Sequence, residues 1–429
     1  MQLKEDIYNF NPWWSEKYKF NYIERPKYLN LLEKALKTKS IVFLTGLRRV
    51  GKTSLMKMLI SKLLKTVDAK HILYLSLDSI SIEKHSTLDL VREFRKLHGL
   101  RRSEKIYLFF DEAVYREGVH LELKNLFDSE NVKIFASSSS SSLLKDKHAL
   151  LTGRAQVIEI LPLNFNEYLL FKKIKIKPSE NYLLEKYFEE YMKTGGMPEY
   201  VLTEDVSYLD SLIDSIIYKD IAYYQGVQDI KSLKDFFRLL MERAGKQASL
   251  NKMAGVIGIS VETAKRYFEY FQNTYLVYAI ERCGKLNERL RAPKKVYTAD
   301  LGIKNFITGF RDKGAIFENL FFLKIKNQNP CYVYKNGNEI DFLIKDRLIE
   351  VKYGREIEGK QKALFEQHSA KEKIIIKDIY NFINYWSYTN KPTKLGKFSE
   401  QLNELKETIK ILGYTIEYKK LTAEENKTG

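Results

Sequence analysis

Residues 46–53 read Gly-Leu-Arg-Arg-Val-Gly-Lys-Thr, which fits the pattern of a phosphate-binding loop. In such a loop glycines let backbone N–H groups wrap round the phosphates, a lysine reaches the β- and γ-phosphates, and a hydroxyl group holds Mg²⁺. The chain supplies these parts in the required order as Gly46, Gly51, Lys52 and Thr53. The stretch therefore predicts a site for ATP and Mg²⁺.

The residues that flank the loop support this prediction. An apolar run over 41–45 precedes the loop and has the composition of a buried strand. A helical pattern over 54–64 follows it, and the N-terminal dipole of that helix adds a positive field at the phosphates. The nucleotide-binding residues predicted from this stretch are Gly46, Arg48, Arg49, Val50, Gly51, Lys52, Thr53 and Ser54.

Further apolar runs place the loop in an α/β domain. They lie at residues 41–45, 72–77, 106–110, 132–136 and 157–160. Segments of helical length separate the runs, which is the βαβ rhythm of a parallel sheet. We therefore expect a P-loop NTPase domain with a parallel sheet over residues 1–175.

An acidic pair at the end of another buried strand supplies the carboxylates that ATP hydrolysis needs. Asp111 and Glu112 follow the apolar run 106–110. We assign Asp111 to the Mg²⁺ ion and Glu112 to the attacking water. The competing interpretation is an acidic turn at a strand end.

Two further polar features are candidates for this catalytic site. The strand over 132–136 runs into three serines, of which Ser138 is the candidate to position the water, although a serine-rich loop tip explains them equally well. Arg154 precedes the last strand and is the candidate to stabilise charge on the γ-phosphate, in its own subunit or in a neighbouring one. A homo-oligomer follows only if Arg154 acts across subunits.

Several short motifs recur along the chain in a familiar combination. They are Asn11-Pro12-Trp13-Trp14, residues 46–53 with their double arginine, the serine-rich strand end, Gly153-Arg154, Leu161-Pro162-Leu163 with Phe165 and Glu167, and Gly195-Gly196-Met197-Pro198-Glu199. Together they resemble the archaeal and bacterial AAA-type ATPases that carry a C-terminal restriction-endonuclease-like domain. The likeness extends over most of residues 10–377.

This resemblance implies a fold and contains one departure. Members are similar to AAA+ and STAND-class NTPases, which implies a five-stranded sheet and a winged-helix middle region. The family pattern has Ile-Gln after the acidic pair, whereas this chain has Ala113-Val114. A contact normally made by that glutamine is therefore expected to be missing or relocated.

Residues 176–294 are predicted to form a helical and winged-helix domain. Apolar residues recur at helical spacing through 182–192, 208–217, 233–241 and 263–271, and no convincing strand is visible between 177 and 282. Within this domain, residues 249–272 have helix-turn-helix spacing, and Ser260 is placed to cap the second helix.

The exposed side of that second helix carries the candidate DNA contacts. They are Thr263, Lys265 and Arg266, beside Glu262, while Ala264, Tyr267, Phe268 and Phe271 are predicted to face inward. Residues 274–280 are the candidate wing strand. The competing interpretation is a winged helix that serves as an ATPase lid or docks a protein partner.

Residues 295–378 are predicted to be a restriction-endonuclease-like α/β domain. Nucleases of that type place a glutamate on a helix, an aspartate on a strand, and Glu-x-Lys on the next strand. The period-2 spacing of Glu350 and Lys352 projects both side chains to one face, beside Asp341 on the paired strand. With Glu318 from the preceding helix, these residues would hold Mg²⁺ and orient water. An ordinary charged hairpin is the alternative.

Charge, cysteine content and hydropathy indicate the partners and the cellular location to expect. A formal net charge of +17 favours attraction to the DNA backbone, although a lysine-rich soluble surface also explains it. The two cysteines are too few for a disulfide framework, and no apolar stretch reaches the about 18 residues of a membrane span. We therefore expect a cytoplasmic protein without a membrane partner. Residues 379–429 are a C-terminal extension with one helix, capped by Ser399 and followed by Gly413, and a strand over 414–419.

Two functional hypotheses follow. The first is a Mg²⁺- and ATP-dependent, DNA-associated ATPase whose C-terminal domain cuts or grips DNA. The second is a STAND-like regulatory switch, in which ATP binding changes the domain arrangement and the nuclease-like domain is a catalytically silent docking surface. A small-molecule kinase lacks a visible acceptor site.

Overall fold

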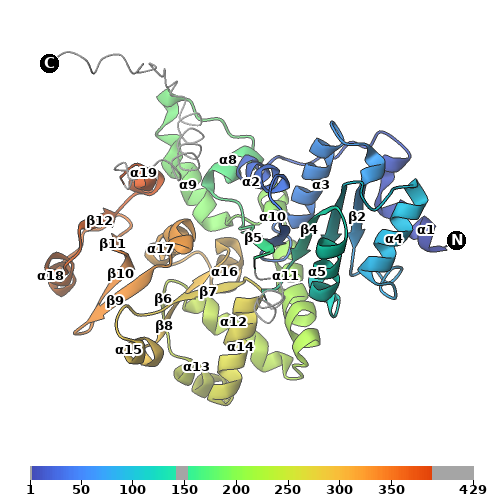
Figure 1. The fold of residues 1–429 in the computed structure, drawn as a ribbon. Coiled ribbons are helices and arrows are strands. Elements are labelled where there is room, and N and C mark those ends of the chain that lie inside the picture. The colour runs from blue at the N-terminus through green and yellow to red at the C-terminus, as the bar shows by residue number, and fades with distance from the viewer. Residues whose placement is uncertain (1, 142–152, 389–429) are drawn as a thin grey trace, which may run out of the picture.

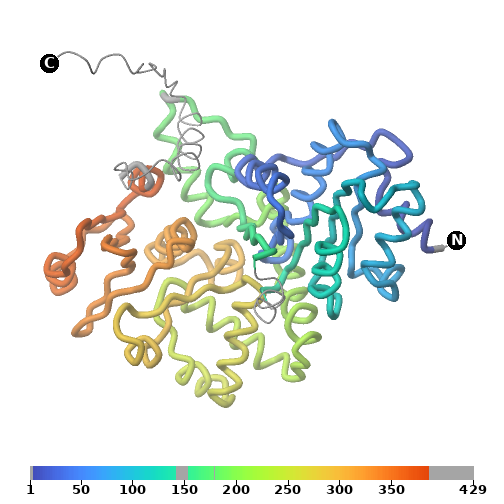
Figure 2. The backbone as a smooth tube through the Cα atoms, in the orientation of Figure 1, coloured from blue at the N-terminus to red at the C-terminus, as the bar shows by residue number. Residues whose placement is uncertain are grey.

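The computed structural model describes residues 2–141 and 153–388. Figure 1 shows a parallel sheet with its helices at one end of the molecule and a four-stranded sheet at the other, with a helical region between them. The tube in Figure 2 follows the same path from blue to red. The predicted helix at Ser399 and the predicted strand over 414–419 lie outside the described residues.

The first sheet is five-stranded and parallel, as the apolar runs predict. Its order is β2-β3-β4-β1-β5. The strands are β1 (Ile41–Thr45), β2 (Ile72–Ser76), β3 (Ile106–Asp111), β4 (Val132–Ser138) and β5 (Ala155–Glu159). Every residue of β1 is buried, because helices cover both faces of the sheet. All five strands end at the edge where the phosphate loop begins.

Helices connect and cover these strands. They are α1 (Gln2–Phe10), α2 (Pro26–Leu36), α3 (Lys52–Leu63), α4 (Thr87–His98) and α5 (Val119–Ser129). Local signals set their ends: Ser86 accepts a hydrogen bond from the amide of Asp89 at the start of α4, and Gly99 ends that helix in a left-handed conformation. The short helix α1 was not predicted.

The region after β5 is mainly helical. Its helices are α8 (Phe165–Phe171), α9 (Leu183–Thr194), α10 (Pro198–Thr203), α11 (Val206–Ser215), a π-helix (Ile216–Tyr223), α12 (Ile230–Glu242), α13 (Leu250–Ile257), α14 (Val261–Asn273) and α16 (Leu301–Thr308). Side chains of this region contribute to the core beneath β1 and, from α8 and α9, to the core of the C-terminal part. The helical region therefore joins the two ends of the molecule.

A small antiparallel sheet completes the helix-turn-helix segment. It has the order β6-β8-β7, with β6 (Lys246–Ala248), β7 (Val277–Ile280) and β8 (Lys294–Thr298). A short helix, α15 (Leu286–Arg291), lies between β7 and β8. The strand β6 has only three residues and was missed. The predicted boundary at 294/295 falls inside β8, which pairs with both β6 and β7.

The Gly195-Gly196 break predicted between helices is a point of close approach. A Cβ atom on Gly196 would lie 2.2 Å from the carbonyl oxygen of Leu163, and one on Gly195 would lie 2.2 Å from the amide nitrogen of Gly302. The buried carboxylate of Asp300 accepts hydrogen bonds from the amides of Gly196, at 2.6 Å, and Ile303, at 3.0 Å. Burial raises the pKa of Asp300 to about 6.

The C-terminal sheet has the order β12-β11-β10-β9. Its elements are α17 (Lys313–Ile325), β9 (Cys331–Lys335), β10 (Asn338–Ile344), β11 (Arg347–Val351), α18 (Gly359–Gln367), β12 (Glu372–Ile376) and α19 (Ile379–Tyr388). The predicted hairpin is present as β10 and β11, which are antiparallel, and β12 runs parallel to β11. The sequence prediction missed α19, which lies at the start of the predicted C-terminal extension.

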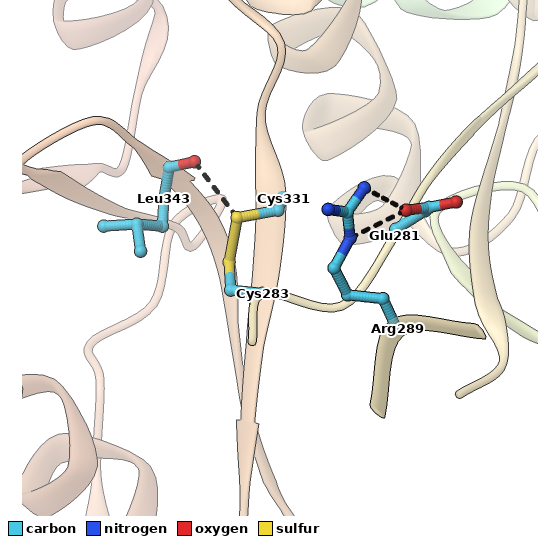
Figure 3. The surroundings of a disulfide bond; sticks show 5 residues. All are labelled: Glu281, Cys283, Arg289, Cys331 and Leu343. Carbon is cyan, nitrogen blue, oxygen red and sulfur yellow. Dashed lines mark hydrogen bonds and ion pairs between the residues drawn. A yellow bond between two sulfur atoms is a disulfide. The ribbon is translucent and has the colours of Figure 1, made fainter. Parts of the chain in front are cut away.

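A disulfide bond joins the two cysteines, which sequence reasoning left unpaired (Figure 3). Cys283 follows β7 and Cys331 begins β9, and 48 residues separate them in sequence. The amide of Cys283 also donates to the carbonyl of Tyr332, at 2.7 Å. On the α15 side, Arg289 pairs with Glu281 at 2.6 Å. The disulfide bond and the amide of Cys283 tie the β7–β8 connection to the C-terminal sheet.

Within the described parts of the chain, no helix is both long and apolar enough to cross a bilayer.

Candidate functional site

The phosphate loop lies between β1 and α3, where the sequence pattern places it. A Cβ atom on Gly46 would lie 2.2 Å from the carbonyl oxygen of Ile160, so this position requires glycine. Gly51 adopts a positive φ of 99° immediately before α3. The two glycines thus let the loop turn tightly from the central strand into the helix, whose first amides face the loop.

Lys52 is folded back onto its own loop. Its ammonium group donates to the carbonyl oxygens of Gly46 and Leu47, both at 3.0 Å. The side chain is only 4% exposed. Burial lowers the pKa of Lys52, and the nearby carboxylates of Glu112 and Asp111 oppose that shift. The ammonium group is therefore held where a phosphate would meet the loop.

Asp111 and Thr53 meet at the end of β3. The Thr53 hydroxyl donates to Asp111 Oδ2 at 2.6 Å, and the Tyr74 hydroxyl donates to the same oxygen at 2.7 Å. Ser137 donates to the other carboxylate oxygen. Threonine and carboxylate oxygens are ligands that Mg²⁺ accepts. The pair predicted to hold the ion is thus adjacent in the fold.

Glu112 lies beside this pair with an unusual backbone. Its φ is 51°, and its amide donates to Ser137 Oγ at 2.8 Å. Burial raises the pKa of Glu112, with Asp111 and Asp220 adding to the shift and Lys52 and Arg48 opposing it. A carboxylate with a raised pKa is a better proton acceptor, as a water-activating base requires.

The serines that contact the acidic pair are Ser137 and Ser139 rather than Ser138. Ser138, the predicted residue, pairs with Thr45 in the sheet, and its hydroxyl donates to the carbonyl of Ser140 at 2.6 Å. Ser137 contacts Asp111, while Ser139 Oγ lies 3.4 Å from Glu112 Oε2. Since alternate residues of a strand point to opposite faces, Ser137 and Ser139 face the acidic pair and Ser138 does not.

Arg154 lies at the wrong edge of the sheet for the role predicted within one subunit. Its carbonyl accepts from the amide of Ile41, the first residue of β1, at 2.7 Å. Its guanidinium pairs with Asp128 at 3.0 Å. In a parallel sheet the residue before a strand and the loop after a strand lie at opposite edges, so Arg154 lies at the edge away from the phosphate loop of its own subunit. A contact across subunits stays a prediction.

Arg48, inside the phosphate loop, contacts a residue that sequence reasoning missed. Its Nε and Nη2 lie 2.9 and 2.6 Å from the two oxygens of Asp220, which belongs to the π-helix. Tyr115, just after the acidic pair, donates to Asp220 Oδ1 at 2.6 Å and accepts from Arg48. Asp220 is the one carboxylate among the mainly apolar residues 216–222, and this isolated acidic residue is the feature of the sequence that could have marked it as a candidate. Arg49 instead lies over the ring of Tyr208, 5.3 Å from its centroid.

The helix-turn-helix face has the predicted inner and outer sides. Ser260 accepts from the amide of Thr263 at 3.1 Å and so caps α14. The residues predicted to face inward are all buried, namely Ala264, Tyr267, Phe268 and Phe271. Lys265 and Arg266 are exposed, and Arg266 donates to Thr263 Oγ1 at 3.3 Å. Exposed Glu262 and Glu269 share this face, so its charge is balanced.

The four residues predicted as a nuclease site come together, but with a cation among them. Lys352 pairs with Glu350 at 3.0 Å, and Glu350 Oε2 accepts from the amide of Asp341 at 3.2 Å. The ammonium group of Lys295, from β8, lies 2.6 Å from Glu318 and 2.7 Å from Asp341. It also lies 2.6 Å from Glu339, and the lysine is 1% exposed.

In this arrangement the ammonium group of Lys295 lies among the carboxylates that were predicted to bind Mg²⁺. Over residues 2–141 and 153–388, no group of three or more His, Cys, Asp or Glu is arranged to hold a metal ion. Burial raises the pKa of Glu318 to about 8 and that of Glu350 to about 9, and the neighbouring Asp341 adds to both shifts. Lys295 supplies a positive charge among these carboxyl groups.

The fold and the loop define the class of the N-terminal domain. Residues 38–169 match the family described as an AAA domain. A second match, to a domain of unknown function (DUF8612), covers residues 185–314. The five-stranded parallel sheet with a phosphate loop after β1 thus belongs to an AAA domain of the P-loop type.

The chain belongs to the family of the uncharacterized protein MJ1544 of Methanocaldococcus jannaschii. The two are 32% identical over 350 residues, which cover 74% of this chain and 77% of the relative. An uncharacterized protein of Haemophilus influenzae is 28% identical over 383 residues, which cover 84% of this chain and 92% of that protein. Among solved structures, the Aeropyrum pernix ORC1 protein in complex with DNA is a remote likeness, with 12% identity, a TM-score of 0.32, and coverage of 68% of this chain and 93% of ORC1.

Proposed function

We propose that this protein is a Mg²⁺-dependent ATPase that works on DNA. The observation that carries the ATPase part is the 2.6 Å contact between Thr53 and Asp111 beside the phosphate loop. It brings the two oxygen ligands for Mg²⁺ together, next to a lysine for the phosphates and a carboxylate for water. The matching AAA domain supports nucleotide binding as the purpose of this arrangement.

Each residue has a defined part in this proposal. Thr53 and Asp111 would hold Mg²⁺, which would supply neutralising charge at the phosphates. Lys52 leaves the carbonyls of Gly46 and Leu47 and turns to the β- and γ-phosphates. Glu112, with its raised pKa, accepts the proton of the attacking water, and the hydroxyl of Ser139 helps to orient that carboxylate.

The DNA part rests on charge and on the helix-turn-helix segment. The net charge of +17 favours the phosphate backbone. Thr263, Lys265 and Arg266 lie on the outer face of α14, the helix that would enter a major groove if the segment with β6, β7 and β8 is a winged helix. Because acidic and basic side chains balance on that face, we expect other basic surfaces of the protein to provide most of the affinity for DNA.

ATP turnover measured with and without DNA tests this proposal. We expect the wild type to hydrolyse ATP in Mg²⁺, Lys52→Ala to abolish turnover, and duplex or single-stranded DNA to change the wild-type rate. DNA binding should weaken as salt is raised, because bound cations are released from the backbone. If DNA leaves the turnover unchanged and salt leaves binding unchanged, the DNA-directed function is wrong and only the ATPase remains.

A second candidate is a STAND-like ATP switch whose restriction-endonuclease-like domain is catalytically silent. Lys295 favours it, since the ammonium group lies 2.6–2.7 Å from Glu318, Glu339 and Asp341, where a nuclease would need a metal ion. The rival is a nuclease in which Glu318, Asp341 and Glu350 bind Mg²⁺ and Lys352 orients water.

Supercoiled plasmid separates the two. A silent domain leaves plasmid intact in Mg²⁺ or Mn²⁺ with both the wild type and Glu350→Ala. Nicking by the wild type and not by Glu350→Ala would establish the nuclease, and equal nicking by both would indicate a contaminant.

A further inference from the structure

The contact between the phosphate loop and the π-helix joins two regions of the chain. Arg48 is the third residue of the loop, and Asp220 lies in the π-helix Ile216–Tyr223, which continues α11 and packs on α12. The guanidinium and the carboxylate form a two-pronged pair, at 2.9 and 2.6 Å. Such bidentate pairs are the stronger kind of ion pair, and they fix orientation.

Both members of the pair are largely shielded from water. The side chain of Arg48 is 19% exposed and that of Asp220 is 4% exposed. Tyr115 donates to Asp220 as well, so the carboxylate is held from the loop side and from the side of the acidic pair. A π-helix is uncommon and often marks a functional position, and here its widened turn carries the carboxylate to the loop.

The pair also lies within electrostatic reach of the catalytic groups. Arg48 and Asp220 both act on the ionisation of Lys52 and Glu112. A γ-phosphate bound between Lys52 and Glu112 would compete with the Asp220 carboxylate for the Arg48 guanidinium, which binds phosphate oxygens well. The γ-phosphate and the Asp220 carboxylate are therefore alternative partners of the Arg48 guanidinium once a triphosphate binds.

We infer that Arg48 senses the γ-phosphate: when ATP binds, the guanidinium leaves the Asp220 carboxylate and binds the γ-phosphate oxygens instead. ADP has no γ-phosphate, so Arg48 stays on Asp220. Asp220 is then a positioning residue that sets the preference for triphosphate over diphosphate. Release of its carboxylate frees the π-helix, which packs on α12, the helix that precedes β6 and the helix-turn-helix. This inference rests on the proposed ATP site. It adds a way in which the identity of the bound nucleotide, ATP or ADP, would alter the packing of the π-helix.

The test compares the dissociation constants of a non-hydrolysable ATP analogue and of ADP, both with Mg²⁺. Asp220→Asn removes the competing charge, so it should strengthen binding of the analogue about tenfold relative to ADP, the size expected for one charged hydrogen-bonded pair. Arg48→Ala should weaken the analogue relative to ADP. The double variant should match Arg48→Ala, because Asp220 acts only through Arg48.

Two further variants keep this test interpretable. Asp214→Asn, in α11, removes a carboxylate that pairs with Lys234 at 2.7 Å, and it should leave the ratio unchanged. Tyr115→Phe removes one hydroxyl that holds Asp220 and should shift the ratio in the same direction as Asp220→Asn by a smaller factor, even if Asp220→Asn folds poorly. In the wild type, the ATP analogue should speed hydrogen exchange in the π-helix and ADP should not.

The outcomes separate this inference from the function beneath it. If the wild type binds both nucleotides and Asp220→Asn leaves the ratio unchanged, the pair is only a structural tie and the inference is wrong while the ATP site stands. If the wild type binds neither nucleotide, or binds them as Thr53→Ala does, the proposed ATP site fails and the inference fails with it.

Discussion

Lys295 Nζ lies 2.7 Å from Oδ1 of Asp341, and this ion pair joins β8 of the small antiparallel sheet to β10 of the C-terminal sheet. The same ammonium group also contacts Glu318 and Glu339, so one buried lysine serves three carboxylates. Its pKa is raised well above the usual value because these carboxylates outweigh the effect of burial. The carboxylates therefore favour the charged form of the lysine.

Replacing Lys295 with methionine should destabilise the fold strongly. The change leaves buried carboxylates without their cation, which costs about 3–5 kcal/mol of unfolding free energy. Urea unfolding of Lys295→Met measures this cost. Lys294→Met, at an exposed neighbour that lies 3.5 Å from Glu281, should change the free energy by less than about 0.5 kcal/mol. Equal effects of the two substitutions would contradict the assigned role.

Glu350 should make stability fall as pH rises. Burial and the neighbouring Asp341 raise its pKa from 4.5 to about 9, so the folded chain keeps a proton that the unfolded chain releases between these values. The folded state therefore loses stability as pH rises from 5 to 9. Glu350→Gln mimics the protonated carboxyl, and its stability relative to the wild type should improve across this range.

Urea unfolding at pH 5, 7 and 9 checks this prediction. Glu356→Gln, which removes an exposed carboxylate paired with Lys377, should give a curve parallel to that of the wild type. A Glu350→Gln curve parallel to the wild type would show that Glu350 is ionised in the folded protein throughout.

The acidic pair should separate nucleotide binding from hydrolysis. Glu112→Gln keeps the shape of the side chain but cannot accept a proton, so turnover should fall at least about 100-fold while the analogue binds within about twofold of the wild type. Asp111→Asn should lose Mg²⁺-dependent binding, since Asp111 is paired with Thr53. Glu117→Gln, on an exposed neighbour, should do neither. Full turnover in Glu112→Gln would remove Glu112 from the mechanism.

The disulfide between Cys283 and Cys331 should contribute to stability. Closing a separation of 48 residues restricts the unfolded chain, so Cys283→Ser should lower the unfolding free energy by about 2–4 kcal/mol under non-reducing conditions. Reducing agent should bring the wild type to the level of the variant. Thiol labelling followed by mass spectrometry of the unreduced protein reads the bond directly, and two labelled thiols would contradict it.

Gly196 and Gly255 should respond oppositely to alanine. A Cβ on Gly196 would lie 2.2 Å from a backbone oxygen of Leu163, so Gly196→Ala should destabilise the turn between α9 and α10 by several kcal/mol. Gly255 lies in α13 with no atom within 4 Å of its added Cβ. Gly255→Ala should therefore stabilise the protein by up to about 1 kcal/mol through helix propensity. The two melting temperatures, measured together, check both.

The sequence predicted the parts of the molecule that local patterns determine. Each of the five strands of the first sheet overlaps a largely apolar run, and the phosphate loop is marked by glycines at positions that disfavour other residues. The inner face of α14 follows from helical spacing. Each of these features is encoded within about ten residues of chain, which is why one sequence suffices to find it.

The rest depends on contacts that spacing does not encode. Asp220 reaches Arg48 across 172 positions, and Lys295 enters a cluster whose other members lie 23 to 57 positions later, so neither partner was visible. Ser138 was chosen over its neighbours because the sequence did not show which face of β4 meets Asp111. The three residues of β6 carry too little pattern to identify a strand, and the predicted domain boundary divides β8 because the strands that pair with it were unknown.

The bond between Cys283 and Cys331 changes what a break in the chain means. The disulfide closes residues 283–331 into a covalent ring that contains α15, β8, α16 and α17. The chain enters this ring from the N-terminal side and leaves it toward the C-terminal sheet, and α15 is exposed. A protease that cuts once in α15 opens the ring but does not divide the molecule, so the AAA domain and the C-terminal sheet stay on one covalent assembly. Such a nicked form would have the mass of the intact protein plus one water until it is reduced.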